Sequence, residues 1–276
     1  MKNPAALLCD LDGTLVADDG AVRPRVAAAI RGLIEREIPV MVVTGRSESG
    51  CVQVAEQLGL RLPVSVYNGA GLWDAKTGNF LEERVLSNRL VARALEFAEQ
   101  EGLLTVNSRR GEKFSSEPAD AIERASLAGL EPLSIVPRSE LPREVLIRIG
   151  FYSKRHGDSA EFCARVGQVL DMPCYLTDFP LAVLAEHRGS PLQVVDIQPP
   201  CRGKGEALRW LTEEHQVQPS QVVAIGDGSN DVPMLERAGL GVVMEGSMGR
   251  ARDVADRVIG SCNSDAIADL IDELFG

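Results

Sequence analysis

The chain has 276 residues, of which 45% are hydrophobic and 25% are charged, so it is long enough for one large domain or two modest domains with ordinary cores. The formal net charge of -11 at pH 7 argues against binding to nucleic-acid backbones or anionic membranes, because both carry charge of the same sign. A small anionic substrate is not excluded, since a local site can be positive within an acidic protein.

The first part of the chain alternates between apolar runs and helical patterns. Apolar runs typical of strands buried on both faces lie at residues 5–9, 39–43 and 64–67. Helical spacing begins at Pro24 and recurs over residues 47–58. This β-α-β-α-β order predicts a parallel sheet with right-handed crossovers. A hairpin is predicted over residues 72–81.

The middle of the chain has another pattern. Helices are predicted at residues 88–100 and 159–170, and strands at 103–106, 145–151, 174–176 and 181–184. The βα alternation then returns, with strands predicted at 194–197, 222–225, 240–244 and 257–259, and helices at 205–215, 231–238 and 266–274. We therefore predict an α/β protein with a Rossmann-like parallel-sheet core, residues 1–85 and 189–276, interrupted by an inserted α+β domain, residues 86–188.

The six cysteines include no Cys-x-x-Cys pair, which argues against a zinc cluster and favours free thiols in a reducing compartment. Asp10 and Asp12 interrupt the apolar N-terminal stretch, which is therefore unlike a signal peptide. No apolar run reaches the roughly 18 residues that a membrane span needs. We expect a cytoplasmic protein that binds neither nucleic acid nor membranes; its oligomeric state is not legible from the sequence.

Four polar clusters lie where ligands bind in parallel sheets, at the carboxyl ends of strands. They are Asp10–Thr14, Thr44–Arg46, Gly203–Gly205 and Gly226–Asp231.

The residue types in these four clusters indicate a site for a cation and a phosphate group. Up to four carboxylates would converge, from Asp10, Asp12, Asp227 and Asp231. Such an arrangement is costly unless a cation neutralises it, and oxygen ligands suit Mg²⁺. Lys204 and Thr44 would suit an anion such as phosphate, and Gly13 and Gly45 would let backbone N–H groups approach phosphate oxygens closely.

These clusters resemble the motifs of a known family. Asp10-Leu11-Asp12-Gly13-Thr14-Leu15 is similar to the first motif of the haloacid dehalogenase superfamily, and Thr44, Lys204 and Gly226–Asp231 resemble its second, third and fourth motifs, in the expected order. Asn68-Gly69-Ala70 adds a feature common in the Cof-like branch. The motifs cover roughly residues 5–84 and 190–260, and the insertion resembles that branch's large α/β cap, which would set substrate specificity, in architecture only.

The resemblance implies a role for each residue. Asp10 would be the nucleophile that forms a phosphoaspartyl intermediate, and Asp12 the general acid and then the general base. Mg²⁺ would be held by the Asp10 carboxylate, the Asp12 carbonyl and Asp227, with Asp231 orienting metal-bound water or Lys204. Thr44 and Lys204 would hold phosphoryl oxygens, Lys204 would also stabilise Asp10, and Asn230 would contact phosphate.

These residues predict a Mg²⁺-dependent phosphatase for a small phosphorylated metabolite, with sugar phosphates favoured. An acid at Asp12 also suits phosphohexomutases and other phosphotransferases of the superfamily, so that reaction stays open. A non-catalytic metabolite-binding protein on the same fold is the third reading. Arg46 is left undecided between a surface residue and a site residue, and the cap carries no signature that identifies the substrate.

Overall fold

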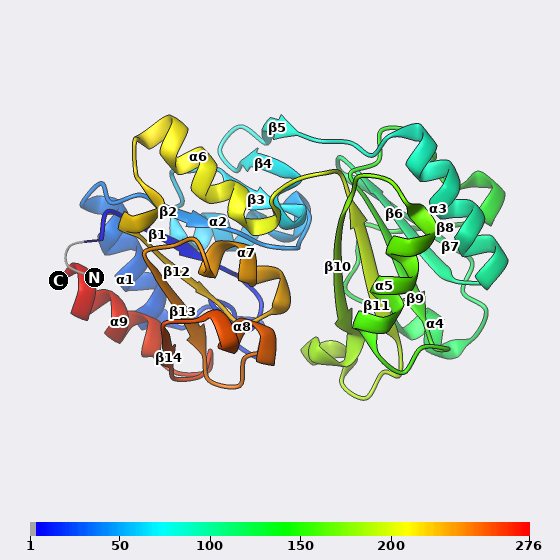
Figure 1. The fold of residues 1–276 in the computed structure, drawn as a ribbon. Helices are drawn as coiled ribbons and strands as arrows, with labels where there is room; N and C mark the ends of the chain where they lie inside the picture. Colours follow the sequence, from blue (N-terminus) through cyan, green and yellow to red (C-terminus); the bar gives the residue numbers. More distant parts are fainter. Residues whose placement is uncertain (1–3) are drawn as a thin grey trace. The chain divides into compact units, whose positions relative to one another are not determined.

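The computed structural model describes residues 4–276, which fall into two compact units (Figure 1). Unit 1 contains the chain up to Glu83 together with Arg202–Gly276, and unit 2 contains Arg84–Cys201. The predicted α/β class, a parallel-sheet core interrupted by an inserted unit, is confirmed.

Unit 1 is built on a five-stranded parallel sheet. In spatial order its strands are β14 (Arg257–Ile259), β13 (Leu240–Met244), β12 (Val222–Gly226), β1 (Ala6–Cys9) and β2 (Val40–Val42). Every residue of β1, β2 and β12 is buried. This explains why their sequences are apolar throughout rather than alternating.

Helices complete unit 1. They are α1 (Pro24–Glu35), α2 (Val52–Leu58), α6 (Glu206–His215), α7 (Val232–Leu235), α8 (Gly249–Val254) and α9 (Ala266–Phe275). The longer ones, α1, α6 and α9, each bury apolar residues on one face. Residues of α6, α7 and α8, among them Leu211 and Met234, share one apolar cluster with Leu8 and Met41 of the sheet. Helices α1 and α9 lie side by side elsewhere in the unit (Figure 1).

A small antiparallel sheet follows α2 in unit 1. Its strands are β3 (Val64–Val66), β4 (Gly71–Asp74) and β5 (Asn79–Glu83). Val43, just after β2, pairs with Ser65 of β3 in a parallel bridge. The end of β2 and the end of β3 therefore lie together, which brings the residues after each strand into one place.

Unit 2 is a six-stranded sheet with helices. The strands, in spatial order, are β10 (Tyr175–Pro180), β11 (Gln193–Gln198), β9 (Arg148–Ser153), β6 (Leu104–Arg109), β7 (Glu112–Ser116) and β8 (Ser134–Val136). The helices are α3 (Asn88–Glu101), α4 (Ala121–Ala125) and α5 (Ser159–Leu170). Helices α3 and α5 lie together over the sheet (Figure 1), where Phe97, Phe151 and Phe162 share one apolar cluster.

The structure corrects the assignment of one predicted strand. Residues 194–197 were expected to belong to the core, but they form β11, which pairs antiparallel with β9 and β10. The second boundary between the units therefore lies at Arg202 and not at residue 189. A short apolar run does not reveal which sheet it will join, because buried strands of both kinds look alike in sequence. The predicted strand over residues 181–184 is a short 3₁₀ turn.

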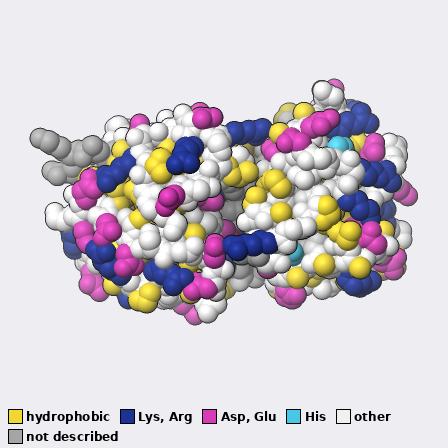
Figure 2. All heavy atoms as spheres, turned by 90° about the horizontal axis from the view of Figure 1, so that it is seen from below, with side chains coloured by type: hydrophobic (Ala, Val, Ile, Leu, Met, Phe, Trp, Pro, Cys, Tyr) yellow, Lys and Arg dark blue, Asp and Glu magenta, His cyan; other side chains and the backbone are white. Residues whose placement is uncertain are grey.

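Charged side chains of both signs are mixed on the molecular face shown in Figure 2. Acidic residues outnumber basic ones, 40 to 29, along the chain. On that face the excess is dispersed rather than gathered into one acidic patch. Among the described residues, none of the helices combines the length and the apolar character required to cross a membrane.

Candidate active site

Parallel pairing of β1 with β12 brings two carboxylates to one edge of the sheet. Cys9 is in register with Ile225, and the Asp10 backbone N–H donates to the Ile225 carbonyl at 2.9 Å. Asp10 therefore follows β1 at the level where Asp227 follows β12. The predicted convergence of the first and fourth polar clusters is what this pairing produces.

Lys204 joins the third cluster to the other two. Its Nζ lies 2.6 Å from Oδ1 of Asp10 and 2.6 Å from Oδ1 of Asp231. All three residues are buried, with exposed fractions of 1% for Lys204, 4% for Asp10 and 0% for Asp231. Burial alone lowers the pKa of Lys204, but the two carboxylates outweigh it and raise that pKa above its usual value. The ammonium is therefore charged.

Asp231 uses both of its carboxylate oxygens within the protein. Oδ1 accepts from Lys204, and Oδ2 accepts from the backbone N–H groups of Asp227, at 3.0 Å, and Gly228, at 2.8 Å. These bonds favour, of the two roles considered for Asp231, the positioning of Lys204. They also fix the backbone of the fourth cluster around Asp227.

Three carboxylates of the site form a group that suits a metal ion. Asp10, Asp227 and Asp231 each offer an oxygen within 4.8 Å of the others. Burial, followed by the charge of Asp231, raises the pKa of Asp10 well above its usual range and that of Asp227 to about 7. Lys204 alone does not neutralise the group. An oxygen-liganded divalent cation, of which Mg²⁺ is the common example, would supply the missing positive charge.

This electrostatic arrangement predicts a pH-dependent effect of Mg²⁺ on stability. Without metal, folded Asp227 retains a proton up to about pH 7, whereas its ordinary pKa is 3.8. The free energy of unfolding of the metal-free protein therefore falls as pH rises through this interval. A divalent cation such as Mg²⁺ would bind the charged carboxylates, so we expect excess Mg²⁺ to raise the thermal midpoint more at about pH 8 than at about pH 6.

Differential scanning fluorimetry with Mg²⁺ and with EDTA at both pH values measures this difference. Asp227→Asn should reduce the Mg²⁺ effect at both. Equal stabilisation of the wild-type protein at the two pH values would contradict the charge assignment.

The loop after β1 approaches Asp227 closely. Gly13 has φ +73°, and a Cβ at this position would lie 2.5 Å from Oδ2 of Asp227. Any side chain would thus be strained by the backbone and would also clash with Asp227. The hydroxyl of Thr14 donates to Oδ1 of Asp227 at 3.4 Å. The positive φ of Gly13 and its close approach to Asp227 explain why this position requires glycine.

The second polar cluster begins with a buried threonine. The Thr44 backbone N–H donates to the Ser65 carbonyl at 2.8 Å, and its Oγ1 accepts from the Arg46 N–H at 3.1 Å. Because Oγ1 acts as an acceptor in that bond, its own O–H can still donate to a phosphoryl oxygen. Thr44 is completely buried, so its hydroxyl is held in a defined place.

The turn Tyr67–Gly69 contacts the other loops. Asn68 has φ +52°, and its Oδ1 accepts from the side-chain amide of Asn230 at 3.0 Å. A Cβ on Gly45 would lie 3.2 Å from the same Oδ1, and one on Gly69 would lie 2.2 Å from the Gly203 carbonyl. Gly45 and Asn230, both predicted to contact substrate, are therefore brought together through Asn68.

Arg46, which the sequence left undecided between a surface residue and a site residue, contacts Asp12 in the structure. Its Nε donates to Oδ2 of Asp12 at 2.9 Å, and its Nη2 pairs with Oδ1 of the same carboxylate. The signal for this contact was present, since Arg46 belongs to the second cluster at a strand end. Sequence alone does not tell whether an arginine after a strand turns toward the site or toward solvent.

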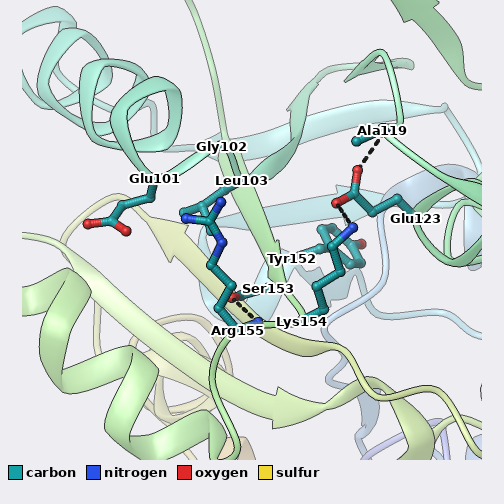
Figure 3. A pocket seen from close by; sticks show the side chains of 9 residues that line it. All are labelled: Glu101, Gly102, Leu103, Ala119, Glu123, Tyr152, Ser153, Lys154 and Arg155. Carbon is teal, nitrogen blue, oxygen red and sulfur yellow. Dashed lines mark hydrogen bonds and ion pairs between the residues drawn. The ribbon is translucent and has the colours of Figure 1, made fainter.

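A hollow lies wholly within unit 2, beside the start of the loop after β9 (Figure 3). Of its charged groups, Lys154 pairs with Glu123 at 3.1 Å and also with Asp120 nearby. The Glu123 carboxylate also accepts from the Ala119 N–H at 2.7 Å. Figure 3 shows Arg155 directed toward Leu103, just after the end of α3. None of the predicted site residues lines this hollow.

Comparison with known proteins gives a family match over nearly the whole chain. A family model described as haloacid dehalogenase-like hydrolase matches residues 7–271. A phosphoglycolate phosphatase of Methanopyrus kandleri is 27% identical, with 98% of this chain and 96% of the relative aligned. An HMP-PP phosphatase of Serratia proteamaculans is 26% identical, with 94% of this chain and 91% of the relative aligned.

Solved structures show the same fold. The haloalkanoate-superfamily phosphatase BT1666 from Bacteroides thetaiotaomicron superposes with a TM-score of 0.80 at 20% identity, covering 99% of this chain and 95% of the other. The two named relatives act, by their names, on different phosphorylated compounds. Similarity of this degree therefore identifies a family without identifying a substrate.

Proposed function

The chain belongs to the haloacid dehalogenase-like hydrolase family, and from this premise we propose that it is a Mg²⁺-dependent phosphatase of a small phosphorylated metabolite, with sugar phosphates favoured. The family assignment confirms the resemblance drawn from the four motifs and the prediction of a phosphatase-type hydrolase. The observation that carries the proposal is the buried Lys204 bridging Asp10 and Asp231, with Asp227 beside them.

In the first step, a carboxylate oxygen of Asp10 attacks the substrate phosphorus. The bond between phosphorus and the ester oxygen breaks, and Asp12 gives its proton to that departing oxygen. The products of this step are the free alcohol and a phosphoaspartyl group on Asp10. Lys204 supports it by balancing charge on the nucleophile and on the transferring group.

In the second step, Asp12 takes a proton from a water molecule, and the oxygen of that water attacks the phosphorus on Asp10. The bond between Asp10 and phosphorus breaks, which releases inorganic phosphate and restores the carboxylate. One side chain acts first as acid and then as base, so Asp12 has to stay close to the same oxygen position in both steps.

Neutral hydrogen-bond donors and the Lys204 ammonium would bind the phosphoryl group. The Thr44 hydroxyl has a free hydrogen to donate, and Asn230 is positioned through Asn68. Backbone N–H groups next to Gly13 and Gly45 can approach phosphate oxygens because neither residue has a Cβ. These groups bind the three oxygens that are common to every phosphate monoester.

The residues that would hold Mg²⁺ are the Asp10 carboxylate, the Asp12 carbonyl and Asp227. Bound there, Mg²⁺ supplies charge neutralisation for the nucleophile and the phosphoryl oxygens. The raised pKa values of Asp10 and Asp227 support a cation at this place.

We assign substrate specificity to unit 2, because the groups in unit 1 recognise only the phosphate and the ester oxygen. The protein's place of action is proposed to be the cytoplasm. No disulfide joins its six cysteines, all of which lie among the described residues, as expected in a reducing compartment.

Phosphate release across a panel of phosphorylated metabolites, with Mg²⁺ and with EDTA, tests the proposal. We expect metal-dependent release that is strongest for a sugar phosphate. Net retention of configuration at phosphorus is expected too, because two in-line displacements invert it twice. Transfer of phosphate between positions of one sugar without net release would indicate a mutase. Tight binding of a metabolite with no turnover would indicate the non-catalytic protein.

A further inference from the structure

The Asp12 side chain is the most exposed part of the proposed catalytic machinery. The exposed fraction of this side chain is 44%, against side-chain fractions of 6% for Asp10 and 1% for Lys204. An exposed aspartate samples several rotamers, and proton transfer requires it within hydrogen-bond reach of one ester oxygen. Another group therefore has to fix its orientation.

Arg46 makes the contact that can do so. Its Nε and Nη2 hold both oxygens of the Asp12 carboxylate, in the planar fork that only a guanidinium provides. Lys204 is committed to Asp10 and Asp231.

Arg46 is itself held at several points. Its backbone N–H donates to Oγ1 of Thr44 at 3.1 Å, and its carbonyl accepts from the Tyr67 N–H at 2.9 Å. Its Nη1 donates to the Gly50 carbonyl at 3.1 Å. A Cβ on Gly50 would lie 3.3 Å from the Arg46 side chain, so the absence of one lets the side chain lie against this loop. The guanidinium thus has a fixed position from which to orient Asp12.

A purely structural role is a weak explanation for this ion pair. Both side chains are partly exposed, 33% for Arg46 and 44% for Asp12, and exposed pairs contribute little to stability. Arg257 and Glu273 form a comparable two-bond pair elsewhere in unit 1, at 2.7 Å and 2.7 Å with exposed fractions of 39% and 52%. That pair serves as a matched reference.

We propose that Arg46 is a positioning residue that holds the Asp12 carboxylate in the orientation needed for proton transfer to the departing oxygen and, later, from water. The inference rests on the proposed phosphatase activity. General acid catalysis matters most for leaving groups that are poor without a proton, and it contributes about 10²–10⁴-fold. Loss of Arg46 should therefore slow alkyl phosphates far more than activated aryl phosphates.

The test compares Arg46→Met with wild type on glycerol 2-phosphate and on 4-nitrophenyl phosphate. For the alkyl ester we expect kcat to fall about 10- to 100-fold, the cost of a misplaced catalytic group. For the aryl ester we expect the pre-steady-state burst of nitrophenol to slow by no more than about 3-fold, followed by slow turnover, because hydrolysis of the phosphoenzyme still needs Asp12 as base. Arg46→Lys keeps the positive charge but cannot form the two-bond fork, so its kcat on the alkyl ester should lie between those of wild type and Arg46→Met.

Arg257→Met is the control. It should leave the rates on both substrates unchanged, and it should change the thermal midpoint as little as Arg46→Met does. Equal slowing of the burst and of alkyl turnover in Arg46→Met would overturn the positioning role, and so would unchanged alkyl turnover. A much larger fall in thermal midpoint for Arg46→Met than for Arg257→Met, with both substrates affected alike, would make Arg46 structural. Absence of turnover by the wild-type protein on these two esters and on every compound of the metabolite panel would refute the phosphatase and this inference together.

Discussion

Replacing Asp10 with Asn is expected to abolish phosphate release, by at least about four orders of magnitude. The amide has nearly the same shape as the carboxylate, and its oxygen can still accept from Lys204. It lacks the charge and nucleophilicity needed to attack phosphorus, so no phosphoaspartyl intermediate forms. The measurement is kcat with the best substrate of the panel, in excess Mg²⁺.

The same substitution should not weaken the fold, which separates loss of chemistry from loss of structure. Burial, and next the charge of Asp231, raise the pKa of Asp10 well above its usual range, so the charged form is disfavoured in the metal-free protein. In EDTA we expect the thermal midpoint of Asp10→Asn to equal or exceed that of wild type at about pH 8.

Asp256→Asn is a suitable control, since Asp256 lies in the same unit and its side chain accepts only from the Gly241 N–H in the described bonds, at 2.8 Å. It should keep full activity. Substantial turnover by Asp10→Asn would mean that Asp10 is not the nucleophile, whatever the family assignment.

Replacing Lys204 with Met should destabilise the protein and also inactivate it. The ammonium lies 2.6 Å from both Asp10 and Asp231 in a buried position. Without it, two buried carboxylates face each other with no cation, which costs about 3–5 kcal/mol in free energy of unfolding when one partner of a buried pair is removed. Activity should fall by about three orders of magnitude or more, because the charge on the nucleophile and the transferring phosphoryl group is no longer balanced.

The pH dependence identifies the cause of this destabilisation. Lowering the pH protonates the carboxylates that Lys204 leaves behind, so the loss of stability should be smaller at about pH 5 than at about pH 8. Urea unfolding of the metal-free protein at both pH values measures it. Lys76→Met, at an exposed turn, is the control and should change little at either pH. A loss in Lys204→Met that is the same at both pH values would point to packing instead of charge.

Several features of the fold could be predicted from local sequence because the burial of a segment determines which of its positions are apolar. Strands β1 and β12 are apolar at every position, as a strand covered on both faces must be. Pro24 marks the start of α1, and Gly59, with φ +64°, marks the end of α2. The predicted parallel sheet followed from the alternation of these elements.

The unit boundary shows where local pattern stops being informative. Residues 194–197 were predicted as one more buried strand, and the choice between the two sheets depends on pairing with Phe151 of β9 and Phe179 of β10. Partners of that kind are distant in sequence. No window of residues around β11 contains the information that places it in unit 2.

The sequence was enough to predict which chemical groups gather at the site, because polar clusters that follow apolar strands commonly bind ligands. Three of the four clusters follow the parallel strands β1, β2 and β12, whereas Gly203–Gly205 follows the antiparallel strand β11 and precedes α6.

Tertiary structure alone decided between the pairings that the sequence left open. Lys204 was expected to stabilise Asp10, and the structure adds that the same ammonium also contacts Asp231, one of the two roles left open for that residue. Arg46 could have faced solvent, yet it holds Asp12. The physical reason is that charge pairing and desolvation depend on distances of a few ångström between residues far apart in the chain, and only the packed sheet sets those distances.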